Sequence, residues 1–360
     1  MYGWAACLAF LVPATAAALY PLALTLAGRA SRRATTRGEP TLTFAILVPA
    51  HDEETTLPAT LRALAALDYP RDKYRVLVVA DNCADGTAAV ARGGGAGCVV
   101  RADDARRGKG FAIAAGLAEL AATAFDVVLI LDADCTLNPT ALRELDAAFA
   151  AGAAVVQAAV RSRNADDGPA GYVAAVGAAV DEALAAGRDR FGGSVALRGT
   201  GMAFRHWVLP LLTWDTASPV EDAEYGRQLR AAGVRVQFCG GAVVACEAPA
   251  AVAALCRQRR RWAAAGPFAS KPLLLAHLVA TVVVCAAVGA FGWWAAALVL
   301  GTAAVYLHAM SRVGLTRRRV RLLLGTPLVV ARLVGVALGG WLRHAPAWDR
   351  TPRFGEGRAA

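Results

Sequence analysis

The chain has 360 residues, 57% hydrophobic and 18% charged, and its mean hydropathy is +0.43. A soluble enzyme of this size carries more charge, so the composition favours a membrane protein. The net charge of +10 comes almost entirely from Arg, because Lys occurs only at 73, 109 and 271. The Arg clusters flank apolar segments instead of alternating with aromatic side chains, which argues against nucleic acid as a partner.

The N-terminal segment is the first predicted element. Residues 4–27 carry no charged side chain, and this uncharged run is long enough to cross a bilayer. A signal peptide is disfavoured because no basic residue precedes this run. Four Arg residues follow, at 29, 32, 33 and 37. By the positive-inside rule they place the next domain in the cytoplasm, so we predict an N-terminal transmembrane helix over 1–28.

A different pattern runs from 41 to 265, where short apolar runs alternate with helical stretches. The predicted strands are 43–49, 75–81, 98–101, 126–132 and 154–157, and the helices between them include 53–67, 109–122 and 139–151. Buried strands that alternate with helices indicate an α/β fold with a largely parallel sheet. Ligands bind such sheets at the carboxyl ends of the strands, where Asp81, Asp132 and the loop 49–53 are expected.

The C-terminal part is again apolar. Residues 272–310 are too many for one span, so we predict two transmembrane helices over 271–310 with a turn near 289–294. Five Arg residues follow, at 312, 317, 318, 319 and 321, and again favour the cytoplasm. The last apolar run, 322–342, has Arg332 at its middle, which would be costly inside a bilayer. We therefore predict a basic cytoplasmic or interfacial segment over 311–360.

The eight cysteines contain no CxxC pair and no Cys/His cluster. This spacing disfavours a zinc site and a dense disulfide framework. We expect small buried apolar residues in a reducing compartment. Their positions are 7, 83, 98, 135, 239, 246, 256 and 285.

The sequence LILDADCT at 129–136 is the strongest local signal for chemistry. Residues two apart on a strand project to the same side, so Asp132 and Asp134 can converge at the strand end. Two carboxylates without a His or Cys partner in ligand spacing suit Mg²⁺ or Mn²⁺ bridged by phosphate oxygens. Alternatively, both carboxylates cap the helix that starts near Pro139, and the motif alone does not decide between the two interpretations.

A strand that ends in D-x-D-x-T also resembles the first motif of haloacid-dehalogenase-like phosphatases, with Asp132 as a phosphoryl-accepting nucleophile. That chemistry needs a Lys before a final acidic pair. No Lys lies between Asp134 and the pair Glu221–Asp222, and the only later one is Lys271, next to the predicted membrane segment. The sequence therefore disfavours a phosphatase.

Further charged side chains stand at element ends. Asp81 ends the second strand, where a carboxylate can bind ribose or base. Lys109 starts a helix, a position where amide groups and positive side chains favour phosphate. Glu221 and Asp222 begin another helix; capping explains Glu221, whereas Asp222 could equally be a general base for a hydroxyl nucleophile. The run RQRRRW at 257–262 could simply anchor a helix at the interface.

Taken in chain order, VPAHDEE, VVADNCADGT, RGKG, LILDADC, VED and Q-x-x-R-W, followed by membrane helices, resemble family 2 glycosyltransferases. The resemblance covers roughly residues 43–265. It is greatest to the membrane-bound branch that includes cellulose, chitin and hyaluronan synthases and many bacterial cell-surface sugar transferases. It implies a Rossmann-like GT-A domain over 41–265, inversion at the anomeric carbon, and a nucleotide-diphosphate-sugar donor, with a UDP-sugar as the first expectation.

The resemblance also implies roles for single residues. The donor would be bound by Ala50, Glu53, Asp81, Lys109 and Asp132. Asp132 and Asp134 match the metal and diphosphate motif, and Asp222 matches the base of the T-E-D motif, whose Thr is Val220 here. Glu221, Gln258, Arg261 and Trp262 would contact the diphosphate or the acceptor. Gly199-Thr200-Gly201 stands where the family has a Gly-containing loop near the acceptor.

The number of predicted membrane helices bears on the product. One helix before the domain and about two after it make a closed polymer channel hard to build, which disfavours a processive polysaccharide synthase. We expect transfer of one sugar, or a few, to a lipid-linked or saccharide acceptor at the cytoplasmic membrane face. The Arg-rich interface would bring the site to anionic membrane lipid. A non-catalytic membrane adaptor is disfavoured because all three key Asp residues are present.

Overall fold

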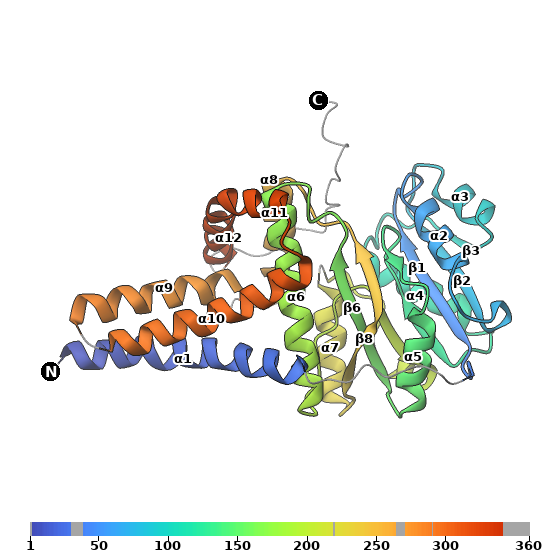
Figure 1. Cartoon of the computed structure of the whole chain (residues 1–360). Coiled ribbons are helices and arrows are strands. Elements are labelled where there is room, and N and C mark those ends of the chain that lie inside the picture. The colour runs from blue at the N-terminus through green and yellow to red at the C-terminus, as the bar shows by residue number, and fades with distance from the viewer. Residues whose placement is uncertain (1, 30–38, 219, 264–270, 290, 341–360) are drawn as a thin grey trace. The chain divides into compact units, whose positions relative to one another are not determined.

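The computed structural model describes residues 2–29, 39–218, 220–263, 271–289 and 291–340. The chain divides into two compact units. We call the first the sheet unit; it comprises residues 32–161 and 191–247. We call the second the helical unit; it comprises residues 1–31, 162–190 and 248–360. Most elements of each unit are labelled in Figure 1.

An eight-stranded sheet forms the centre of the sheet unit, in the order β3-β2-β1-β4-β7-β6-β8-β5. The five predicted strands correspond to β1, β2, β3, β4 and β6. The strand bounds are β1 Phe44–Ala50, β2 Tyr74–Asp81, β3 Gly97–Arg101, β4 Val127–Ile130, β5 Thr136–Leu137, β6 Val155–Ser162, β7 Met202–Arg205 and β8 Val236–Cys246.

The pairing of these strands is mixed. β1 is buried along its whole length and pairs in parallel with β2 and with β4, and β2 pairs in parallel with β3. The predicted α/β fold and its parallel sheet are confirmed over these strands. β7 is antiparallel to β4 and to β6, and β5 is antiparallel to β8. The sheet is therefore mostly parallel and mixed, with an antiparallel part that the strand pattern did not predict.

The helices of the sheet unit bury apolar side chains against this sheet. On α2 the buried residues Leu57, Leu61 and Leu64 recur at the spacing of one helical face. They share one core with Leu142 and Leu145 of α5. The helix bounds are α2 Leu57–Ala65, α3 Thr87–Gly93, α4 Lys109–Leu120, α5 Ala141–Ala150 and α7 Glu221–Ala231, with 3₁₀ turns at Arg71–Lys73 and His206–Leu211.

The helical unit contains the apolar helices predicted near both ends of the sequence, together with α6 and α8 from the predicted domain 41–265. The elements are α1 Tyr2–Arg29, α6 Pro169–Arg190, α8 Val252–Ala263, α9 Lys271–Val288, α10 Gly292–Val313, α11 Arg317–Leu322, the 3₁₀ turn Leu323–Gly325 and α12 Thr326–Gly340. The two helices predicted over 271–310 correspond to α9 and α10, whose shared turn includes Gly289 in a left-handed conformation.

Helix α6 belongs to the helical unit, although it lies inside the predicted domain 41–265. It crosses α1 closely, since a Cβ built on Gly187 would lie 2.0 Å from the carbonyl oxygen of Leu24. Two ion pairs tie α6 to the C-terminal helices: Lys271–Asp181 at 2.6 Å and Arg312–Glu182 at 2.7 Å. The packing thus divides the chain differently from the sequence, because close packing and charge pairs join α6 to the apolar helices.

Among the residues that the structure describes, three segments are long and apolar enough to cross a membrane: Leu8–Arg29, Gly292–Val313 and Arg317–Gly339. The apolar part of α9, Leu274–Val288, is shorter. The segment Arg317–Gly339 includes Arg332. Its length and composition do not distinguish a helix that crosses the membrane from one that lies at the membrane interface. That orientation stays a prediction, and the residues 341–360 of the predicted basic segment lie outside the described residues.

The cysteine prediction is wrong for Cys135 and Cys246, which form a disulfide in the sheet unit. The register of two strands explains the pairing. Thr136 of β5 lies opposite Ala245 of β8 in an antiparallel pair, so the preceding and following residues also face each other. Their Cα atoms lie 4.5 Å apart, the usual spacing of a non-hydrogen-bonded pair. The two cysteines are 111 residues apart in sequence, so no local spacing reveals the bond.

Candidate active site

Charged side chains converge at the carboxyl end of β4. Lys109, the first residue of α4, donates from Nζ to a carboxylate oxygen of Asp132 and to the carbonyl oxygen of Gly199, the latter at 2.6 Å. Its Nζ also lies 3.6 Å from Oε1 of Glu221 at the start of α7. One ammonium group therefore joins the strand end, a glycine loop and a helix start. The structure brings together three residues that the sequence predicted for the site.

The charge of Lys109 is balanced by its neighbours. Burial of the ammonium group lowers its pKa, but Asp132, Glu221 and Asp222 raise it more, so the pKa of Lys109 lies above its usual value. Lys109 is therefore protonated at neutral pH.

Glu221 and Asp222 form the acidic start of α7. Burial raises the pKa of both carboxyl groups, and the nearby ammonium of Lys109 acts in the opposite direction. Oδ1 of Asp222 accepts a hydrogen bond from the backbone N–H of Ala223 at 2.8 Å. A Cβ built on Gly199 would lie 3.7 Å from Oδ2 of Asp222, so the glycine loop packs against this carboxylate. A carboxylate with a raised pKa holds a proton more strongly, as a general base must.

The loop 198–201 is held by a residue that the sequence analysis missed. The side chain of Gln157 on β6 accepts from the backbone N–H of Arg198 at 3.0 Å and donates to the carbonyl oxygen of Thr200 at 2.9 Å. The hydroxyl of Thr200 accepts from the backbone N–H of Asp132 at 3.0 Å. Gln157 is 1% exposed. A Gln in a predicted buried strand was the available signal, because buried amides need partners.

Asp132 and Asp134 both lie where a divalent cation fits. Their carboxylate oxygens and Sγ of Cys135 all lie within 4.8 Å of one another. The Cys135 sulfur is bonded to Cys246, so it is not a thiolate and the available donors are oxygens. Two carboxylates of this kind suit Mg²⁺ or Mn²⁺. The loop between strand and carboxylates is anchored where Thr60 of α2 donates to the carbonyl oxygen of Ala133 at 2.7 Å.

Asp81 ends β2 and is buried. Its Oδ1 forms an ion pair with Nη1 of Arg101 at 2.5 Å and accepts from the side-chain amide of Asn82 at 3.2 Å. The backbone carbonyl of Asp81 lies 2.7 Å from Nδ1 of His51. Asp81 therefore occupies the predicted strand end, held by neighbours that fix its orientation.

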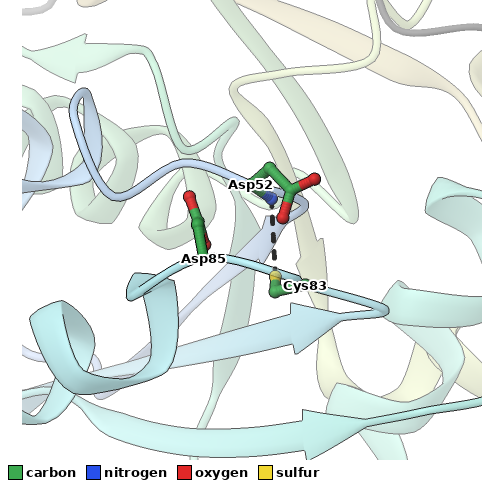
Figure 2. A group of neighbouring side chains, drawn as sticks. All are labelled: Asp52, Cys83 and Asp85. Carbon is green, nitrogen blue, oxygen red and sulfur yellow. Dashed lines mark hydrogen bonds between the residues drawn. The ribbon is translucent and has the colours of Figure 1, made fainter.

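Two loops that follow β1 and β2 are tied together in Figure 2, which draws Asp52, Cys83 and Asp85. The backbone N–H of Asp52 points to Sγ of Cys83 at 3.4 Å, and Oδ1 of Asp52 accepts from the N–H of Ala84 at 2.7 Å. Oδ1 of Asp85 accepts from the N–H of Thr87 at 2.9 Å. These carboxylates satisfy loop amides, which explains the acidic cluster without a metal.

The predicted donor residues Ala50 and Glu53 flank this region. Ala50 ends β1 and is buried. Glu53 is also buried; its backbone N–H donates to the hydroxyl of Thr87 at 2.7 Å, and its carboxylate accepts from the hydroxyl of Thr56. The structure thus gives Glu53 a local role in joining two loops. Donor binding by Ala50 and Glu53 stays a prediction.

Gln258, Arg261 and Trp262 lie on α8, which belongs to the helical unit. The residues around Lys109 belong to the sheet unit. Gln258 and Trp262 are four residues apart, which places these two on one face of that helix. Trp262 is 37% exposed, and the guanidinium of Arg259 lies 4.4 Å from the centre of its ring. Their contacts with a diphosphate or acceptor stay predictions.

Helix α4 approaches the loop before α7 so closely that Gly110 is required. A Cβ built there would lie 2.4 Å from the carbonyl oxygen of Thr216 and 2.9 Å from that of Trp214. We expect Gly110→Ala to lower the free energy of unfolding by about 1–3 kcal/mol, the usual cost of overpacking. Gly93→Ala is the control, since a Cβ on this helical glycine meets nothing within 4 Å. Denaturant unfolding measures both; equal stabilities would contradict this packing.

The comparison with protein families identifies the chain. Residues 40–265 match the family described as "Glycosyltransferase like family 2". The chain therefore belongs to glycosyltransferase family 2, as the order of motifs predicted, and it is a transferase enzyme by class. The match spans the strand end with Asp132, the α4 start with Lys109 and the α7 start with Glu221 and Asp222.

Individual relatives agree with this class. The chain is 28% identical over 230 residues to a probable glycosyltransferase, YdaM, of Bacillus subtilis, covering 61% of this chain and 54% of that protein. It is also 28% identical over 230 residues to beta-monoglucosyldiacylglycerol synthase of Synechocystis, covering 61% of this chain and 47% of that protein. The chain thus spans about half the length of these curated relatives.

Among solved structures, the chain is similar to a mannosyltransferase from Pyrobaculum calidifontis in complex with GDP-mannose and Mn²⁺. The TM-score is 0.55 at 19% identity, covering 92% of this chain and 98% of that one. At this identity the similarity establishes the fold alone. It confirms the predicted GT-A architecture.

Proposed function

We propose that this protein is an inverting glycosyltransferase that moves a sugar from a nucleotide-diphosphate sugar to an acceptor hydroxyl at the cytoplasmic membrane face. The observation that carries the proposal is the convergence of Lys109, Asp132, Glu221 and Asp222. In this arrangement the ammonium of Lys109 lies beside Asp132, for which we propose metal binding, and Asp222 is the proposed general base. The solved mannosyltransferase of similar fold, which holds GDP-mannose and Mn²⁺, supports a donor of this chemical class.

Asp132 and Asp134 would hold the divalent cation, Mg²⁺ or Mn²⁺. When bound, the ion supplies positive charge that offsets the charge growing on the diphosphate leaving group. Lys109 acts in the same direction, because it is protonated at neutral pH and lies against Asp132. Asp81, with Ala50 and Glu53, would bind the nucleoside part of the donor at the ends of β1 and β2.

Asp222 would accept the proton of the acceptor hydroxyl as its oxygen attacks the anomeric carbon. Attack from the face opposite the leaving group inverts that carbon. Glu221 lies nearer to Lys109, so it would balance the ammonium charge and keep Lys109 in place. Gln258, Arg261 and Trp262 would contact the diphosphate or the acceptor, with Arg261 adding positive charge and Trp262 an aromatic surface.

The acceptor we propose is lipid-linked. The Synechocystis relative is named as a synthase of a glucosyl diacylglycerol, which is a glycolipid. In the described part of the chain, three segments are long and apolar enough to cross a membrane, which suits an acceptor that lies in a bilayer. Anionic membrane lipid would contact the Arg residues that flank these segments. A saccharide acceptor remains the alternative that product analysis distinguishes.

A donor panel tests the proposed function. Purified full-length protein in detergent is incubated with Mn²⁺ and each of a set of UDP-, GDP- and TDP-sugars, and release of the nucleoside diphosphate is measured. We expect release from one nucleotide class, and faster release when membrane lipids are added. Absence of release across the whole panel would contradict a nucleotide-sugar donor.

The topology gives a separate prediction. If the sheet unit is cytoplasmic, α10 crosses with its Trp293 end outside and its Ser311 end inside, because Arg312 and the α11 arginines follow Ser311. We expect Trp293→Cys, but not Ser311→Cys, to react with an impermeant maleimide on intact cells. Ser311→Cys should react only after permeabilisation. The reverse pattern would place the catalytic residues outside.

A further inference from the structure

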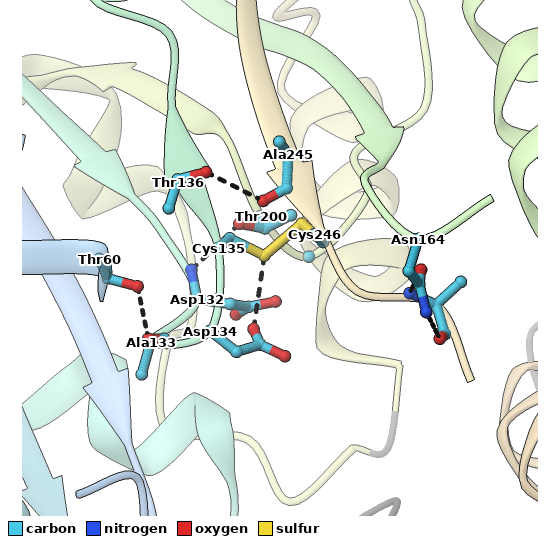
Figure 3. Close-up of a disulfide and its surroundings, with 12 residues drawn as sticks. Thr60, Asp132, Ala133, Asp134, Cys135, Thr136, Asn164, Thr200, Ala245 and Cys246 are labelled. Atoms are coloured by element: carbon cyan, nitrogen blue, oxygen red, sulfur yellow. Dashed lines mark hydrogen bonds between the residues drawn. A yellow bond between two sulfur atoms is a disulfide. The ribbon is translucent and has the colours of Figure 1, made fainter. Parts of the chain in front are cut away.

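The disulfide lies directly beside the proposed metal carboxylates, as Figure 3 shows. Cys135 follows Asp134 in sequence, and its Sγ lies 3.4 Å from Oδ1 of Asp134. Since a disulfide sulfur carries no hydrogen, this is a packing contact and not a hydrogen bond. The same sulfur is within 4.8 Å of carboxylate oxygens of both Asp132 and Asp134. A reduced Cys135 would therefore add a thiol beside the two carboxylates that would hold a cation.

The loop that carries Asp134 depends on this bond at one end. Asp132 is fixed by its N–H to Thr200, and Ala133 by its carbonyl to Thr60. Beyond Asp134, the two-residue strand β5 pairs with β8, and the disulfide to Cys246 closes that junction. Beyond β5, Asn138 exchanges hydrogen bonds with Val243 of β8 at 3.0 and 2.7 Å. The disulfide is the covalent restraint on this side of the loop, and it acts at the residue directly after Asp134.

We propose that the Cys135–Cys246 disulfide holds Asp134 and keeps a thiolate ligand out of the metal site. Its reduction then weakens Mg²⁺ or Mn²⁺ binding and creates an Asp132–Asp134–Cys135 site for Zn²⁺. The inference rests on the proposed function, because it assumes that Asp132 and Asp134 bind a metal. A thiolate is a soft ligand that suits zinc, whereas carboxylates alone suit hard cations. A disulfide in a cytoplasmic domain is most often redox-sensing.

The exchange reaction is balanced by a dithiol such as dithiothreitol. Its thiolate attacks Sγ of Cys246, which is partly exposed, whereas Cys135 is 1% exposed. The S–S bond breaks, Cys135 leaves as a thiolate, and the second thiol of the reagent then displaces Cys246 and closes a cyclic disulfide. Two electrons pass from the reagent to the protein, and the two cysteines end as thiols with the two protons of the dithiol.

Two variants separate the two halves of the proposal. Cys135→Ser and Cys246→Ser both remove the disulfide, but only Cys246→Ser leaves a thiol at 135. Both should weaken Mn²⁺ binding by about 10- to 100-fold, the usual loss when a group that orients a metal ligand is removed. Only Cys246→Ser, and the reduced wild type, should gain Zn²⁺ affinity. Cys98→Ser on β3 is the control and should match the oxidised wild type.

The test uses full-length protein in detergent, with Mn²⁺ and Zn²⁺ titrations by calorimetry before reduction, after dithiothreitol is applied and removed under argon, and after reoxidation with diamide. Circular dichroism confirms folding.

The proposal predicts that reduction lowers the affinity for Mn²⁺ reversibly and raises the affinity for Zn²⁺. Equal Mn²⁺ affinity in both redox states would overturn it while leaving the proposed metal site intact. No Mn²⁺ binding in the oxidised protein would overturn the metal site as well. If the reduced protein and both variants were unfolded, the disulfide would have a purely structural role, and this too would overturn the proposal.

Discussion

Asp222→Asn is expected to reduce the rate of sugar transfer by roughly 10²–10⁴-fold, the usual contribution of a positioned general base. Donor affinity should change little, because Lys109, Asp81 and the metal carboxylates would hold the nucleotide sugar. Turnover and calorimetric donor binding are measured on the same preparation. Loss of donor binding as severe as the loss of turnover would make Asp222 a binding or folding residue.

Stability and pH provide controls for this variant. Because burial raises the pKa of Asp222, the folded protein binds its proton more tightly than the unfolded chain does. The ionised carboxylate therefore lowers stability at pH values above that raised pKa, and Asp222→Asn should raise the melting temperature at neutral pH. Wild-type turnover should fall as the pH drops through a value above the ordinary 3.8 of an aspartate. Glu221→Gln should reduce the rate of sugar transfer less than Asp222→Asn does.

Removal of the divalent cation is the second change with a large expected effect. Asp132 and Asp134 offer oxygen ligands, so activity should require Mg²⁺ or Mn²⁺ and vanish in EDTA. Asp134→Asn should weaken metal and donor binding together, since Asp132 and Asp134 would hold the cation that supplies positive charge to the diphosphate. Asp85→Asn is a matched control, because this carboxylate accepts from the N–H of Thr87 in another loop. Full activity in chelator, after metal analysis confirms removal, would sink the assignment.

Local patterns predicted much of the fold and the centre of the site. The strands around β1 are recognisable in the sequence as short apolar runs. Acidic residues that follow such strands lie at the carboxyl edge of a parallel sheet. Lys109 was predictable because it follows a glycine at a helix start. These features depend on neighbouring residues, which the sequence displays directly.

Other features depend on long-range packing that no local pattern encodes. The Cys135–Cys246 bond follows from the β5–β8 register across 111 residues. The role of Gln157 becomes visible only when its side chain lies under the loop 198–201. In sequence, helix α6 lies inside the predicted domain 41–265. Its contacts with α1 and α10 assign it to the helical unit.

The most direct test of the central claim follows a labelled sugar from donor to product. Purified wild-type protein and its Asp222→Asn variant are given a nucleotide sugar labelled in the sugar, with Mn²⁺ and a membrane lipid extract. We expect wild-type protein to release the nucleoside diphosphate and to move the label into the organic phase with inverted anomeric configuration, whereas the variant binds the donor and transfers little. Label that stays on the nucleotide in both reactions, with every donor tried, would contradict the account.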